Sequence, residues 1–162
     1  MRRSPGLVAG RNTMDQLTKD HTELYGYRFE DLRVGMSAAF SRTIGEADIL
    51  MFAGVSGDTN PVHLNEEFAA GTMFGQRIAH GMLSASFIST VFGTKLPGPG
   101  CVYLSQSLKF KAPVKVGDTV LARVTVKELV RERRRAVFDT VCTVGAKTVL
   151  DGQAEILVPA RD

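Results

Sequence analysis

The sequence predicts an α+β fold in which one antiparallel β-sheet wraps around a central buried α-helix. The first observation is residues 82–92, where every position is apolar, Ser or Thr, because a helix that is apolar nearly all round is normally buried. The second is the last third of the chain, where apolar residues alternate over four segments, as expected for strands joined by short turns. These segments are residues 102–110, 120–126, 136–144 and 150–158.

The first half of the chain is less regular. Residues 34–44 are predicted to form a strand that follows a turn at Gly35, and residues 46–54 carry the apolar stripe of a helix. Residues 56–63 (SGDTNPVH) are rich in turn-forming types and are predicted to be an irregular loop. A short helical segment is expected over residues 68–74 before the buried helix begins.

The length of 162 residues suits a single domain, which we place at residues 27–160. Residues 1–26 are polar, contain glycine and show no sustained period, so we interpret them as a flexible N-terminal tail. No internal repeat or low-complexity segment is visible.

Composition excludes several classes of protein. The net charge of +3 is too small and too scattered to indicate nucleic-acid binding, and the arginine cluster at 131–135 looks like a tight turn. No run of 18 apolar residues is present, so no membrane span is expected, and we favour a cytoplasmic location. Two cysteines, Cys101 and Cys142, exclude a disulfide framework, and three histidines without HxH or HxxxH spacing leave too few ligands for a metal site.

The irregular loop contains Asp58 and His63, five residues apart. A carboxylate and an imidazole are the usual pair for moving protons near neutral pH, and such pairs commonly lie in loops held by a rigid scaffold. Spacing alone leaves a second interpretation open, in which Asp58 forms an Asx turn and His63 caps the next segment. Asn60 and Pro61 would hold and stiffen the turn.

A second candidate site lies at His80-Gly81-Met82, where a loop meets the buried helix. The start of a helix has unpaired N–H groups and a partial positive charge, and a glycine lets a ligand approach its N–H closely. This is the geometry of an oxyanion hole. Equally, Gly81 could simply permit tight packing or a turn.

Together these segments resemble the MaoC-like (R)-specific enoyl-CoA hydratases and 3-hydroxyacyl-thioester dehydratases, which have the hot-dog fold. The likeness covers residues from about 27 to 158. The residues that carry it are Phe52-Ala53-Gly54-Val55-Ser56-Gly57-Asp58-Thr59-Asn60-Pro61-Val62-His63, Phe68-Ala69, His80-Gly81-Met82-Leu83, Gly93-Thr94-Lys95-Leu96-Pro97-Gly98-Pro99-Gly100 and Tyr103-Leu104-Ser105-Gln106.

The resemblance implies a role for each matching residue. Asp58 and His63 would hold and activate the water, and the Gly81 N–H would bind the thioester oxygen. Asn60 and Ser89, the latter on the central helix, would belong to the substrate-binding group. The family needs no metal or redox cofactor, acts on enoyl-CoA or enoyl-acyl-carrier-protein substrates, and usually forms at least a homodimer with its sheets joined edge to edge.

Three alternatives remain at this point. The same site run in reverse would be a 3-hydroxyacyl-acyl-carrier-protein dehydratase, separated from a hydratase only by the carrier. A hot-dog thioesterase would need a carboxylate aimed at the carbonyl carbon, and the intact Asp58 and His63 loop argues against it. A non-catalytic acyl-binding subunit is expected only where that pair is lost.

Overall fold

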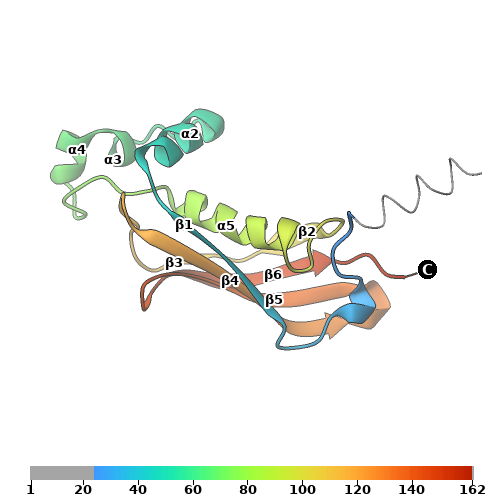
Figure 1. The fold of residues 1–162 in the computed structure, drawn as a ribbon. Helices are drawn as coiled ribbons and strands as arrows, with labels where there is room; N and C mark the ends of the chain where they lie inside the picture. Colours follow the sequence, from blue (N-terminus) through green and yellow to red (C-terminus); the bar gives the residue numbers. More distant parts are fainter. Residues whose placement is uncertain (1–23, 162) are drawn as a thin grey trace, which may run out of the picture.

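A computed structural model describes residues 24–161 of the chain. One six-stranded antiparallel sheet packs against a 14-residue helix, and three shorter helices gather at the end of the molecule where that helix begins (Figure 1). The helices are α2 (Glu46–Ser56), α3 (Pro61–Leu64), α4 (Glu66–Ala70) and α5 (Gly81–Thr94). The strands are β1 (Ser37–Thr43), β2 (Val102–Gln106), β3 (Lys109–Phe110), β4 (Thr119–Val130), β5 (Arg135–Val144) and β6 (Lys147–Leu157). The fold class predicted from the sequence is therefore confirmed.

The sheet has the order β1-β4-β5-β6-β2, with the short strand β3 also paired to β6. The alternation of apolar residues places one set of side chains on a single face, and in β4 and β5 these side chains are buried. The β4–β5 turn contains a single 3-10 turn, Arg131–Arg133, followed by Arg134 with a φ of 51°. The prediction of a tight turn in the arginine cluster is confirmed.

The predicted meander of four strands needs a correction. Strands β4, β5 and β6 do follow one another as a meander, but β2 pairs with β6 and lies at the far edge from β1. The reason is the segment after β3, which crosses the molecule instead of turning back at once. In this segment Lys111 N–H donates to Val149 O, and Ala79 N–H donates to the Val114 carbonyl.

Helix α5 packs one face onto the concave side of the sheet. Its buried side chains are Leu83, Ser84, Ala85, Phe87, Ile88, Val91 and Phe92. Phe92 packs edge-on against Phe138 of β5 with ring centroids 5.0 Å apart. Removing a side chain of this size from water contributes about 1.5–3 kcal/mol to folding, so this face anchors the helix.

The burial of α5 is not complete in the single chain. Met82, Ser86, Ser89 and Gly93 lie on one side of the helix and are exposed. Their spacing of four, three and four residues marks one helical face. The sheet of one chain covers only the opposite face, so the central helix is buried on the side that meets the sheet and exposed on this one.

The start of the domain at residue 27 stays a prediction, and the backbone next to it is bonded to the rest of the fold. Gly26 N–H donates to Pro99 O and Tyr27 N–H donates to Pro97 O, so the chain is bonded to the loop after α5 from Gly26 onward. Backbone groups make these contacts, so no pattern of apolar residues in the sequence reveals them. The remainder of the proposed tail, residues 1–23, lies outside the described residues. No helix within residues 24–161 is long and apolar enough to cross a membrane.

Candidate active site

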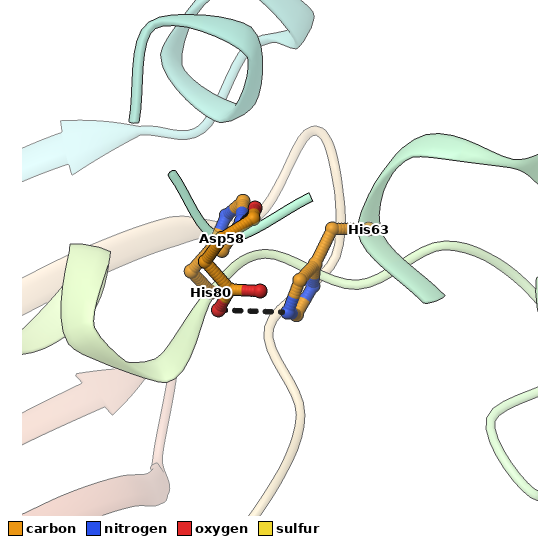
Figure 2. Close-up of side chains that lie close together, drawn as sticks. All are labelled: Asp58, His63 and His80. Atoms are coloured by element: carbon orange, nitrogen blue, oxygen red, sulfur yellow. Dashed lines mark hydrogen bonds and ion pairs between the residues drawn. The ribbon is translucent and has the colours of Figure 1, made fainter. Parts of the chain in front are cut away.

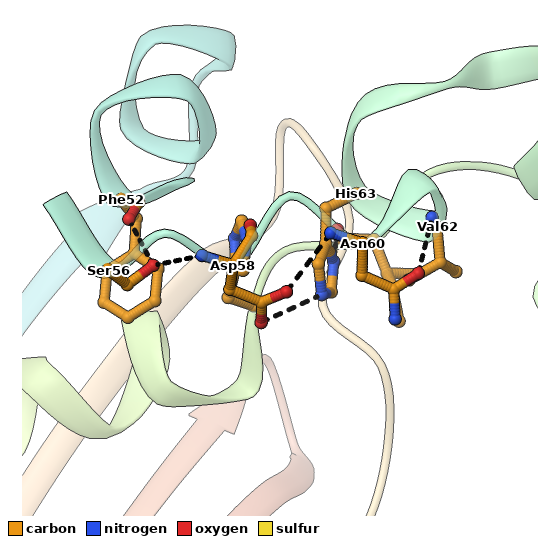
Figure 3. A network of polar contacts seen from close by, with 8 residues as sticks. Phe52, Ser56, Asp58, Asn60, Val62 and His63 are labelled. Atoms are coloured by element: carbon orange, nitrogen blue, oxygen red, sulfur yellow. Dashed lines mark hydrogen bonds and ion pairs between the residues drawn. The ribbon is translucent and has the colours of Figure 1, made fainter. Parts of the chain in front are cut away.

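The loop after α2 is shaped by a chain of short-range hydrogen bonds (Figure 3). Helix α2 ends at Gly57, whose φ of 77° lies in the left-handed region that glycine adopts easily. Ser56 Oγ donates to the Phe52 carbonyl and accepts from the Asp58 N–H. Asp58 Oδ1 in turn accepts from the Asn60 N–H at 3.2 Å. The loop is therefore ordered, although it has no regular structure as far as Asn60.

Asn60 and Pro61 begin helix α3, which the sequence did not predict. Asn60 Oδ1 accepts from the Val62 N–H, and Pro61 occupies the first helical position, where its missing N–H has no consequence. This single helical turn directs the His63 side chain inward, so that His63 is only 8% exposed. Asn60 is thus a capping residue, and its structural interpretation agrees with the contacts it makes.

Asp58 and His63 face one another (Figure 2). Asp58 Oδ2 lies 4.0 Å from His63 Nε2, and the Asp58 side chain is half exposed whereas that of His63 is buried. His63 Nδ1 lies 2.8 Å from the Ile78 carbonyl. Because a carbonyl only accepts, Nδ1 carries the proton, and the free lone pair of the neutral ring is on Nε2, toward Asp58.

Gly81 is the first residue of α5 and lies on the same cavity as Asp58 and His63. The N–H groups of a first helical turn have no acceptor within their own helix. The cavity has a volume of about 490 Å³, and its walls are mostly apolar, with Phe74, Phe110 and Ile78 among them. The structure therefore brings together an acid–base pair, a helix start and an apolar chamber.

An ion-pair network links helices α2 and α4, which flank the Asp58 loop and α3 in the sequence. Arg77 donates through Nη1 to Glu46 at 3.0 Å and through Nε to Glu66 at 2.8 Å. Glu46 begins α2 and Glu66 begins α4, so one guanidinium ties together the elements on either side of the Asp58 loop. These pairs keep the pKa of Arg77 above its ordinary value, the hydrogen bond to Glu46 being the larger cause.

The structure does not bring Ser89 to the pair. Ser89 is exposed and lines a separate groove with Phe52, Met82 and Tyr103. The serine of α5 that lines the cavity is Ser84, which is 2% exposed and has an Oγ without a hydrogen-bond partner among the described residues. A contact between Ser89 and a substrate stays a prediction.

His80 is a site residue whose side chain the sequence did not single out. Its ring is 1% exposed, and its Nε2 lies 2.9 Å from the Asp58 carbonyl. Asp58, His63 and His80 hold donor atoms within 4.8 Å of one another, a set that could in principle ligate a metal. The imidazoles are stacked, however, with centroids 3.8 Å apart and planes 31° apart. An ion near the plane of one ring would lie well outside the plane of the other, so this geometry disfavours a shared ion.

Similarity to known proteins agrees with the fold and the site. An antiparallel sheet around one helix, with an Asp and a His before the start of that helix, defines a hot-dog protein of the hydratase type. Residues 31–150 match the family described as MaoC like domain, so this chain belongs to that family.

Two curated relatives cover most of the chain. An (R)-specific enoyl-CoA hydratase of Rhodospirillum rubrum is 58% identical over 86% of this chain and 96% of the relative. A 3-hydroxybutyryl-CoA dehydratase of Methylorubrum extorquens is 51% identical over 86% of this chain and 89% of the relative. Among solved structures, the R-hydratase PhaJ1 of Pseudomonas aeruginosa, in its unliganded form, superposes with a TM-score of 0.80 at 43% identity. That match covers 85% of this chain and 89% of the other.

Proposed function

We propose that this chain is an (R)-specific enoyl-CoA hydratase, a hydro-lyase that reversibly adds water to trans-2-enoyl-CoA and gives (R)-3-hydroxyacyl-CoA. The observation that carries the proposal is the 4.0 Å gap between Asp58 Oδ2 and His63 Nε2, in a cavity that also contains the start of α5. Two relatives more than half identical to the chain have names that describe this reaction in its two directions.

The gap suits one water molecule. Hydrogen bonds of ordinary length from a single water reach two acceptors that are 4–5 Å apart, roughly the separation here. The water donates one hydrogen toward Asp58 and the other toward the lone pair of His63 Nε2. Its oxygen is then free to attack C3 of the enoyl thioester.

We assign Asp58 as the base and His63 as the residue that orients the water and relays the proton. As the bond from oxygen to C3 forms, one proton of the water passes to Asp58 and the other stays as the 3-hydroxyl hydrogen. The proton is returned to C2 by way of His63, which restores both side chains. General acid–base steps of this kind typically contribute about 10²–10⁴-fold each.

The Gly81 N–H stabilises the negative charge that develops on the thioester oxygen. Attack at C3 moves negative charge to the thioester oxygen, and an N–H at the start of α5 can donate to that oxygen with the helix dipole behind it. One preorganised donor of this type is typically worth about 3 kcal/mol in the barrier. The apolar walls contributed by Met73 and Phe74 would accommodate part of the substrate next to this oxyanion site.

We also propose that the protein forms at least a homodimer. Strand β2 is an edge of the sheet, and its Val102, Tyr103 and Leu104 are 37–50% exposed. An exposed apolar edge favours pairing with another strand. The exposed face of α5 lies in the same groove as β2, since Ser86 and Ser89 share it with Leu104. Multi-angle light scattering tests this proposal, because a Leu104→Lys variant is expected to have a lower mass than the native assembly.

The central experiment is hydration of crotonyl-CoA, followed as loss of the enoyl thioester absorbance, with chiral analysis of the product. The proposal requires an (R)-3-hydroxy product, and an (S) product would overturn it. Release of free thiol without hydration would indicate a thioesterase. Comparing kcat/KM for enoyl-CoA and enoyl-acyl-carrier-protein substrates distinguishes the hydratase from a carrier-protein dehydratase. A cytoplasmic location stays a prediction of the sequence.

A further inference from the structure

The imidazole of His80 is the most enclosed polar side chain near the site. It is 1% exposed, and its ring packs against two aromatic neighbours. The ring centroid of His63 is 3.8 Å away and that of Phe52 is 4.9 Å away. His80 also directly precedes Gly81, so its peptide group carries the N–H that we assign to the oxyanion site. The proposed reaction gives its side chain no chemical step.

One hydrogen bond fixes the protonation of this ring. His80 Nε2 lies 2.9 Å from the Asp58 carbonyl oxygen, and a carbonyl only accepts, so Nε2 carries a proton. His80 Nδ1 is buried and has no partner among residues 24–161. A second, unpaired N–H there would lose all of its hydration, and in a charged ring that loss is larger than for an unused lone pair. The contacts therefore select the neutral ring with its proton on Nε2.

We propose that His80 is a positioning residue that holds the three functional groups of the site in one geometry. Its Nε2–H restrains the backbone of Asp58, its face restrains the plane of the His63 ring, and its own backbone leads into the Gly81 N–H. A single side chain thus couples the loop after α2 to the start of α5. This inference rests on the proposed hydratase function and deepens it.

The coupling has a specific consequence for catalysis. The Asp58 side chain is half exposed, and the Asn60 N–H is its one hydrogen-bond donor within residues 24–161, so its direction depends on its backbone. A shift of about 1 Å in a reacting group can cost about 10²-fold in rate. Losing the His80 donor should therefore lower kcat, while the cavity that binds the substrate stays in place and KM changes little.

Two variants of the full-length chain separate the hydrogen bond from the packing. His80→Phe keeps an aromatic ring beside His63 and Phe52 but has no donor, and we expect its kcat to fall about 10²-fold with KM nearly unchanged. His80→Gln offers an amide N–H that can reach the Asp58 carbonyl, and we expect it to keep most of the wild-type kcat. Ile44→Val is the control, because it removes one methylene from a buried residue that does not line the cavity.

A spectroscopic measurement tests the same bond without activity. Long-range ¹H–¹⁵N spectra of the wild-type protein should contain the signal of a histidine in the neutral Nε2–H tautomer that is absent from the spectrum of His80→Gln. An Nδ1–H tautomer for His80, or a His80→Phe variant with wild-type kcat, would overturn the inference. If His80→Phe does not fold, the wild-type tautomer and the kcat of His80→Gln decide the question. A wild-type protein that hydrates no enoyl thioester would instead reject the proposed function, and the tautomer would still report on the bond.

Discussion

His63 Nε2 faces the Asp58 carboxylate across 4.0 Å, a separation too long for a direct hydrogen bond and suited to one bridging water. The opposite nitrogen of the same ring is fixed by the Ile78 carbonyl at 2.8 Å. The His63 ring is therefore fixed through Nδ1, and its free nitrogen, Nε2, is directed toward Asp58. Asp58 is held through its backbone and by the Asn60 N–H, which leaves its second carboxylate oxygen available.

Replacing Asp58 with Asn should abolish most activity without harming the fold. The Asn side chain can still accept the Asn60 N–H, and the position is half exposed, so we expect little change in Tm. The amide cannot take a proton from water, and kcat should fall by about 10²–10⁴-fold. Crotonyl-CoA hydration and thermal unfolding by circular dichroism measure the two quantities.

The matched control for that variant is Asp139→Asn, an identical change at an exposed position on β5. It should leave kcat at the wild-type value. Near-full activity in Asp58→Asn would show that the assigned base is wrong.

Asp48 should make stability depend on pH in the acid range. Its carboxylate accepts from Arg42 Nε at 3.1 Å and from the Gly45 N–H at 2.8 Å. The hydrogen bond from Arg42, and secondly that from Gly45, lower the pKa of Asp48 below its usual 3.8. A lowered pKa in the folded state stabilises the protein above the unfolded-state value, and this contribution is lost as the pH falls through the folded-state value.

Asp48→Asn tests that dependence. It removes a charge-assisted hydrogen bond, so we expect a loss of about 1.5–3 kcal/mol in the free energy of unfolding at pH 7. The difference between wild type and variant should narrow as the pH is lowered below 3.8. Urea unfolding at several pH values measures the difference. A gap that stays constant down to pH 2 would contradict the assigned cause.

Much of the fold could be predicted because most of its helices and strands follow from patterns in the local sequence. Alternation located β4, β5 and β6, and the uncharged stretch from Met82 located α5 to within two residues at each end. The place of β2 beside β6 could not be predicted, since alternation does not say which strands pair. That choice depends on the long crossing segment after β3, whose backbone bonds to Val149 become visible only in the structure.

The site was partly predictable for a related reason. The turn-rich loop and the family resemblance both pointed to Asp58 and His63, which the structure places face to face. Ser89 was chosen on the resemblance alone, and it lies five residues after Ser84, about 140° around the helix. The cavity therefore meets Ser84 and not Ser89 in the single chain. For the buried side chain of His80, the one usable signal in the sequence was its position directly before an apolar helix.

The two cysteines should be unreactive in the native protein. Burial raises the pKa of the Cys142 thiol to about 12 and also raises that of Cys101 above its ordinary value. Alkylation needs the thiolate, so modification by iodoacetamide at pH 8 should be slow at both positions and slowest at the fully buried Cys142. Intact-mass spectrometry over time measures it. Both thiols should react readily in guanidinium, and rapid modification of native Cys142 would contradict its burial.

Gly81 should tolerate a methyl group only if Phe110 gives way. A Cβ built on Gly81 would lie 2.6 Å from Phe110 Cε1, far inside ordinary contact distance. Phe110 is at the end of β3 and 55% exposed, so its ring can move without unfolding the protein. Both residues line the cavity, and the displaced ring or the new methyl group would crowd the thioester beside the Gly81 N–H. We therefore expect Gly81→Ala to fold but to have a lower kcat and a higher KM.

A double-mutant cycle gives the decisive test of that clash. Phe110→Ala should restore part of kcat/KM when it is combined with Gly81→Ala, because the obstructing ring is gone while the N–H remains. Residues in contact typically show coupling of about 0.5–3 kcal/mol, so the two changes should be clearly non-additive. Gly54→Ala on helix α2 is the control, because its added Cβ would meet no atom within 4 Å and Gly54 does not line the cavity, so activity should be unaffected. Additive effects of Gly81→Ala and Phe110→Ala would show that crowding by the ring is not the cause of the loss.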